Sequence, residues 1–141
     1  MQLITRSEKQ TIALGKKIAS KLKGGEVLAL TGDLGAGKTT LAKGIALGLN
    51  IKKTIASPTF VLMKVYKVNS KLINKLVHID CYRINDAEEI KAIGATEYFG
   101  QPNTVVLIEW PERIKKILPG QTRPIKLRLI KENLREITIL Y

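Results

Sequence analysis

Apolar residues divide the chain into strand-like and helix-like stretches that alternate. Residues 26–31 form a short, mostly apolar run, which is typical of a strand buried on both faces, and residues 104–109 repeat that pattern. Between them, residues 40–49 carry Leu and Ile at helical intervals, which predicts a helix. This alternation predicts an α/β fold.

An amphipathic helix is expected before the first buried strand, over residues 7–22. Ser7 and Gln10 have the spacing of a capping box, and a Gly-Gly pair ends the pattern. The predicted inward positions are Ile12, Leu14, Ile18 and Leu22.

Two further pairs of apolar runs indicate hairpins, each joined by a short polar turn. The runs of the first pair are residues 60–68 and 72–80, and those of the second are residues 125–130 and 135–141. Hairpins depart from strict alternation, so we expect a three-layer fold with a mixed, partly antiparallel central sheet. The 141 residues suit one domain, over 1–141, and they show no linker or repeat.

The turn between the first buried strand and its helix carries the clearest chemical signal. It reads G-x-x-x-x-G-K-T from Gly32 to Thr39, a pattern whose backbone N–H groups converge on phosphate oxygens at a helix N-terminus. Lys38 would reach the terminal phosphates, and the Thr39 hydroxyl would bind Mg²⁺. The predicted nucleotide-binding positions of this stretch are Asp33, Leu34, Gly35, Ala36, Gly37, Lys38, Thr39 and Thr40. The alternative is a glycine turn without a ligand.

Acidic residues end two of the predicted strands. Asp80 stands where a phosphate-binding site needs a second magnesium contact, although a strand-ending Asp or a helix cap explains it equally well. Glu109 would lie beside the terminal phosphate, where a carboxylate orients an attacking water, or it serves the structure alone. Trp110, which follows it, either stacks on a ligand or partner or packs internally.

Composition adds a strong positive charge. The formal net charge is +12, which attracts nucleic acid, acidic proteins or nucleotides, although scattered lysines are often only a solvated surface. Cys81 and His78 are the single cysteine and histidine, so neither an internal disulfide nor a zinc site of these two residues alone is expected. The sequence shows no long apolar segment and no leader, which favours a cytoplasmic protein without membrane contact.

The choice of nucleotide and reaction rests on weaker signals. An Asn-Lys-x-Asp motif that reads guanine is missing, which favours ATP over GTP. No long Arg-rich lid follows the phosphate motif, so hydrolysis is preferred to phosphoryl transfer. A nucleotide-sensing assembly module with little hydrolysis and a small-molecule kinase remain the alternatives.

Several motifs, taken together, resemble the TsaE (YjeE) family, the ATPase component of bacterial tRNA threonylcarbamoyladenosine (t6A) synthesis. The stretches that carry the resemblance are residues 24–26, 32–40, 57–60, 78–83, 94–98 and 108–113. The resemblance implies an ATP- and Mg²⁺-dependent ATPase that works with the TsaB and TsaD proteins, and tRNA contact that is indirect or through a basic surface. It also implies that Thr39, Asp80 and Glu109 serve the metal, that Thr59 lies on a loop that senses the nucleotide, and that Glu109 and Trp110 support hydrolysis with Lys38.

Overall fold

The computed structural model describes residues 1–53, 55–56 and 61–140. In chain order its elements are β1 (Gln2–Thr5), α1 (Glu8–Ala19), β2 (Val27–Thr31), α2 (Lys38–Gly48), β3 (Met63–Lys67), β4 (Lys75–Asp80), α3 (Glu88–Ala92), η1 (Ala95–Tyr98), β5 (Thr104–Glu109), η2 (Pro111–Ile117), β6 (Arg123–Lys131) and β7 (Leu134–Ile139). The two buried strands and the helix after the glycine-rich turn are confirmed, with boundaries within two residues of the expected ones.

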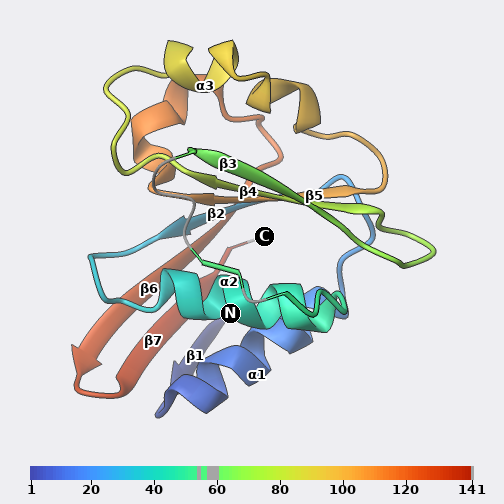
Figure 1. The fold of residues 1–141 in the computed structure, drawn as a ribbon. Coiled ribbons are helices and arrows are strands. Elements are labelled where there is room, and N and C mark those ends of the chain that lie inside the picture. The colour runs from blue at the N-terminus through green and yellow to red at the C-terminus, as the bar shows by residue number, and fades with distance from the viewer. Residues whose placement is uncertain (54, 57–60, 141) are drawn as a thin grey trace.

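All seven strands of the described residues form one sheet, in the order β1-β7-β6-β2-β5-β4-β3 (Figure 1). Strands β6, β2, β5 and β4 are parallel to one another. Strand β3 pairs antiparallel with β4, and β7 pairs antiparallel with both β6 and β1. The sheet is therefore mixed and partly antiparallel, as the two predicted hairpins require.

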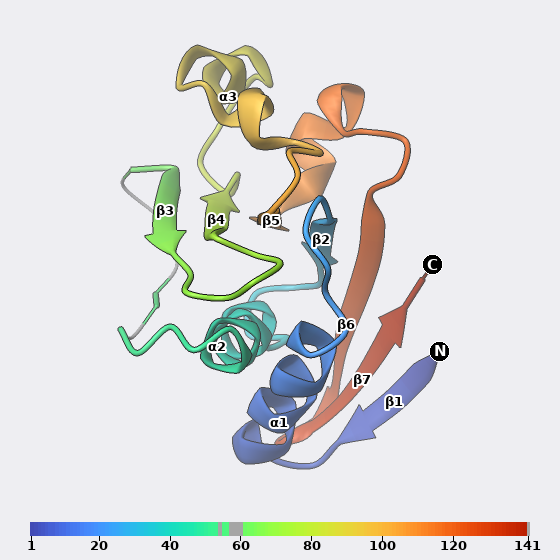
Figure 2. The same ribbon diagram turned by 90° about the vertical axis from the view of Figure 1, so that its right-hand side faces the viewer.

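Helices cover both faces of the sheet, which gives three layers (Figure 2). One face packs on α1 and α2, and the other packs on α3, η1 and η2. Strand β5 shows how the pattern produces this arrangement: Val105 and Leu107 belong to the first core, while Val106 and Ile108 belong to the second. A strand covered on both sides needs an unbroken apolar run, and this explains the sequence signal.

Helix α1 lies unusually close to α2, and this changes which residues it buries. A Cβ atom on Gly15 would lie 2.7 Å from the Cα atom of Gly44, a distance that real Cβ atoms do not show. The fully buried stripe of the helix is therefore Thr11, Gly15 and Ala19. Leu22 is buried, and Leu14 and Ile18 are half-buried and pack against the core, so these three predicted inward positions are confirmed. Ile12 is half-buried and is not among the residues that pack against the core.

The capping prediction for α1 is confirmed. Ser7 is the N-cap residue, and its Oγ accepts a hydrogen bond from the backbone N–H of Gln10 at 3.1 Å. The Gln10 side chain in turn accepts from the backbone N–H of Arg6. The Ser7 contact satisfies a donor that the helix end leaves open, and the Gln10 contact ties the residue before the cap to the first turn. They fix the start of α1 directly after strand β1.

Candidate functional site

The glycine-rich turn connects the carboxyl end of β2 to the N-terminus of α2. Gly32, Gly35 and Gly37 have φ angles of 150°, 83° and 102°, a region that glycine adopts without strain. Gly37 is the N-cap residue of α2 and provides no side chain to satisfy the first N–H groups of the helix. These groups and the helix dipole make the turn a cradle for an anion.

Lys38, in the first turn of α2, is folded back over this cradle. The side chain is buried, with 5% of its surface exposed, and its Nζ donates to the backbone oxygens of Gly32 and Asp33. The same Nζ lies 4.2 Å from the centre of the Trp110 ring. Burial lowers the pKa of Lys38, while the nearby Glu109 carboxylate acts against that shift. The two carbonyl oxygens are neutral acceptors, so they bind the ammonium group of Lys38 more weakly than charged phosphate oxygens would.

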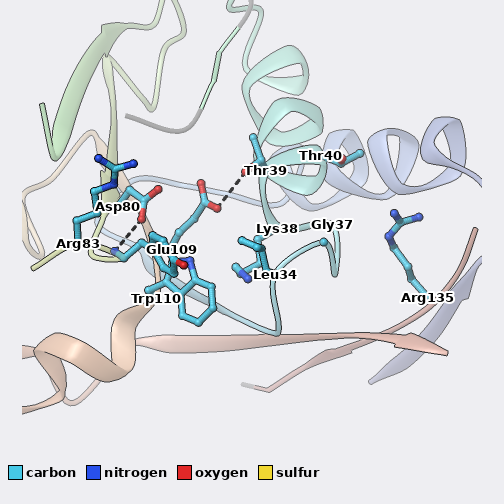
Figure 3. A pocket seen from close by; sticks show the side chains of 12 residues that line it. Leu34, Gly37, Lys38, Thr39, Thr40, Asp80, Arg83, Glu109, Trp110 and Arg135 are labelled. Carbon is cyan, nitrogen blue, oxygen red and sulfur yellow. Dashed lines mark hydrogen bonds between the residues drawn. The ribbon is translucent and has the colours of Figure 1, made fainter. Parts of the chain in front are cut away.

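The two strand-end carboxylates lie at the same edge of the sheet. Parallel pairing of β4 and β5 places Asp80 directly opposite Glu109. The Oδ1 atom of Asp80 accepts a hydrogen bond from the backbone N–H of Tyr82 at 2.9 Å. Figure 3 shows both carboxylates facing the start of α2, where Thr39 donates from its hydroxyl to Oε1 of Glu109 at 3.1 Å.

Glu109 has a second, fully buried partner. Its Oε2 atom lies 2.6 Å from Nε2 of His78, which has no exposed surface, and Glu109 itself is 2% exposed. The Nδ1 atom of His78 has no hydrogen-bond partner within the described residues. A carboxylate oxygen accepts hydrogen bonds, so Nε2 of His78 is the donor in this contact. Thr39 and His78 therefore hold the Glu109 carboxylate from two sides.

Trp110 closes the site next to Glu109. Its backbone is in the left-handed region, with φ of 57°, which turns the chain from β5 directly into η2. The ring is half-buried and lies 5.0 Å, centre to centre, from the ring of Tyr82. The indole thus lies against Lys38 at the carboxylate end of the cradle.

These groups surround a cavity of about 420 Å³. Its lining residues are Leu34, Gly35, Gly37, Lys38, Thr39, Thr40, Asp80, Tyr82, Arg83, Glu109, Trp110 and Arg135. Asp33 and Ala36, also predicted from the motif, contribute their carbonyl groups to contacts with Lys38 and Arg135. Thr59 lies outside the described residues, so its role stays a prediction.

The donor set of the cavity fits a nucleotide with Mg²⁺. The buried ammonium group of Lys38 and the backbone N–H groups of the turn suit phosphate oxygens. Hydroxyl and carboxylate oxygens, from Thr39, Asp80 and Glu109, suit a hard cation. In the part of the chain that the structure describes, no three His, Cys, Asp or Glu side chains form a group able to hold a metal. A magnesium ion here would therefore depend on phosphate oxygens and water for its remaining ligands.

His78 and Arg135 are site residues that sequence reasoning missed. His78 had a signal: it is a polar residue between the apolar residues Val77 and Ile79 of strand β4. Arg135 had none, since it is one of many basic residues and reaches the turn only through the order of strands in the sheet.

The site defines a P-loop nucleotide-binding protein. It combines a buried parallel strand, a glycine-rich cradle with Lys38 and Thr39, and carboxylates on the neighbouring strand ends. The family described as threonylcarbamoyl adenosine biosynthesis protein TsaE matches residues 5–137. The chain is 41% identical to the tRNA threonylcarbamoyladenosine biosynthesis protein TsaE of Treponema pallidum, covering 99% of both chains. It is 42% identical to the TsaE protein of Bacillus subtilis, covering 95% of this chain and 81% of the relative. The chain therefore belongs to the TsaE family.

A solved structure supports the same conclusion. The crystal structure of YdiB from Bacillus subtilis matches with a TM-score of 0.81 and 36% identity, over 99% of this chain and 83% of that chain. The predicted P-loop architecture and the family resemblance are thus confirmed. Among the described residues, no helix has the length and apolar character needed to span a membrane.

Proposed function

We propose that this protein is the ATP-hydrolysing, Mg²⁺-dependent component of t6A biosynthesis and that it acts in the cytoplasm with the TsaB and TsaD proteins. Family membership supports the pathway. One observation carries the hydrolytic activity: a buried carboxylate, Glu109, is fixed between Thr39 and His78 at the edge of the phosphate cradle. A fixed carboxylate at this place suits the orientation of an attacking water.

Each residue of the cradle has a role that follows from its position. Lys38 exchanges its carbonyl partners for phosphate oxygens and offsets the negative charge there. Thr39 and Asp80 would contribute oxygen ligands to Mg²⁺, which would supply positive charge to offset the charge of the phosphate groups. Glu109 would accept a hydrogen bond from the attacking water and orient it, and its contact with the Thr39 hydroxyl places its carboxylate beside an oxygen that would hold the metal.

The replacement of Glu109 by Gln tests this proposal. Glu109→Gln keeps the size of the side chain but removes the base, so turnover falls by about 10²- to 10⁴-fold, the usual contribution of general-base catalysis. Binding of ATP, measured by calorimetry, remains. Glu97→Gln, an exposed carboxylate on η1, is the control and keeps wild-type turnover.

The partner dependence needs a separate measurement. ATP hydrolysis is measured for the chain alone and with TsaB and TsaD, with Lys38→Ala as the blank. Turnover that rises with the partners and vanishes in the blank supports a coupled ATPase. Intact ATP binding without turnover in any mixture favours a nucleotide-sensing assembly module, and phosphoryl transfer to a metabolite favours a small-molecule kinase.

By resemblance to the family, Thr59 belongs to a loop that senses the nucleotide. Thr59→Ala is then expected to weaken ATP-dependent partner binding.

The location of the positive charge supports contact with tRNA. A groove of about 770 Å³ beside the edge strand β3 is lined by Asn50, Ile51, Lys52, Lys53, Lys64, Val65, Tyr66 and Lys67. The four lysines are exposed, and among the described residues no acidic side chain lines the groove. Phosphate contacts of this kind release counterions, so association with tRNA weakens steeply as salt rises. A flat salt response in filter binding contradicts this part of the proposal.

A further inference from the structure

A second cavity, which we call the α1 groove, lies between helix α1 and the sheet. Helix α1 lies beside β1, β7 and β6 (Figure 2), and the walls of the groove come from α1, from the residues that follow it and from the strands. The groove has a volume of about 130 Å³ and shares no lining residue with the nucleotide cavity. Its function is therefore separate from nucleotide binding.

The floor of the α1 groove is apolar. Leu14 and Ile18, one helical turn apart on α1, line it together with Leu3, Leu28 and Ile139 of the sheet. Both helix residues are half-buried, so part of their apolar surface stays open to solvent. A cavity of about 150 Å³ with such a lining holds one benzene ring, whereas ligand pockets measure about 300–1,000 Å³. The groove therefore fits one large apolar side chain and not a cofactor.

The same groove is lined by three cationic side chains, Lys17, Lys21 and Arg123. The two lysines are exposed and the arginine is half-buried. Among the described residues, no acidic side chain lines the groove, and no salt bridge involves any of the three cations. An acidic ligand would supply the countercharge that the chain itself does not place there.

Charge and lining together select the kind of ligand. A second copy of the chain brings a formal net charge of +12, so repulsion opposes self-association at this groove. RNA has the complementary charge, but among the described residues no aromatic side chain lines the groove to stack on a base. A protein segment with acidic residues around one large apolar side chain matches both the floor and the cations.

We propose that the α1 groove is a docking site for an acidic segment of a partner protein, which inserts one large apolar side chain, such as Phe or Leu, between α1 and the sheet. The inference rests on the proposed function, in which TsaB and TsaD are the partners, and it assigns the segment to their complex. Because the groove and the nucleotide cavity share no lining residue, the contact contributes to partner affinity with and without ATP.

Binding of the full chain to immobilised TsaB–TsaD complex, measured by biolayer interferometry with and without ATP and Mg²⁺, tests this proposal. The double substitution Lys17→Glu and Lys21→Glu weakens binding by about 10-fold in both conditions, because like charges then face the acidic segment, and the loss shrinks at high salt. Ile18→Ala weakens binding by about 10-fold through lost apolar contact. The matched control, Lys9→Glu with Lys16→Glu, makes the same charge change at exposed positions of α1 outside the groove. It leaves the affinity within about threefold, because only the long-range field changes.

Two further measurements separate docking from other effects of the substitutions. Thermal unfolding without partner shows that each variant is folded, and the calorimetric affinity for ATP stays at its wild-type value. Wild-type partner affinity in the folded Lys17→Glu, Lys21→Glu variant overturns the proposal, and so do equal losses in the two double variants. Filter binding that shows a loss of tRNA affinity in that variant, with TsaB–TsaD affinity unchanged, assigns the cations to RNA and also overturns it.

Failure of the proposed function gives a different result. A wild-type chain that binds ATP but not the TsaB–TsaD complex overturns the proposed partnership and this inference with it. Partner binding that depends on Lys17 and Lys21 in a chain without ATP turnover overturns the hydrolytic role alone and supports the docking site.

Discussion

Replacement of His78 by Leu removes the buried donor that holds Oε2 of Glu109. The imidazole has no exposed surface and lies 2.6 Å from the carboxylate, so no solvent molecule takes its place without rearrangement. A hydrogen bond to a charged group contributes about 1.5–3 kcal/mol. If the bond orients the carboxylate for hydrolysis, its loss lowers kcat by about 10- to 150-fold, at about 1.4 kcal/mol for each factor of ten.

The assay is steady-state ATP hydrolysis, together with ATP affinity and the thermal midpoint of each variant. His78→Gln is the control that retains a side-chain N–H donor, and it recovers part of the lost kcat. Affinity for ATP changes little in both variants, because His78 does not line the cavity. The reasoning is refuted if His78→Leu keeps wild-type kcat while folded, or if Gln and Leu variants lose turnover equally at equal stability.

The remaining predictions concern three residues that do not line the nucleotide cavity: Gly44, Cys81 and Ser7. Gly44→Ala places a Cβ atom 3.0 Å from the Gly15 Cα atom. The overpacking costs about 1–3 kcal/mol, which exceeds the gain in helix propensity, so the thermal midpoint falls. Gly120→Ala is the control, because a Cβ atom there lies in open space and does not lower the midpoint. Burial raises the pKa of Cys81 to about 12, so iodoacetamide at pH 8 alkylates this thiol only after unfolding, which mass spectrometry detects. Because the pKa of Cys81 is higher in the folded chain than in the unfolded chain, the unfolded chain loses this proton at lower pH. The free energy of unfolding therefore falls as the pH rises from about 9 to about 12. Ser7→Ala removes the cap of α1 and lowers the free energy of unfolding by about 1 kcal/mol in urea titrations.

Local signals explain why much of the fold was predictable. The phosphate cradle, its strand and its helix are consecutive in sequence, so the motif and the hydrophobic periodicity of one stretch are enough to predict them. Both hairpins are also local, because each turn lies between the runs that pair.

Long-range pairing explains what the sequence did not reveal. Strand β1 has only four residues, without a turn to mark it, and its partner β7 lies at the far end of the described chain. The close approach of α1 to α2 depends on two glycines, Gly15 and Gly44, that look unremarkable in separate helices. The pairing of β6 with β2 brings the β6–β7 hairpin, and with it Arg135, to the glycine-rich turn.

The same sheet order sets the sequence of events when the protein is synthesised. Strand β1 leaves the ribosome first, but its hydrogen-bonding partner β7 follows only after every other strand has been made. The P-loop strand β2 likewise waits for β6 to cover its second edge. Early segments therefore emerge with unpaired edges, which are the surfaces that chaperones protect and that aggregate when exposed. A nascent chain gains its complete nucleotide cavity only when the hairpin closes, so ligand affinity is acquired late in biogenesis.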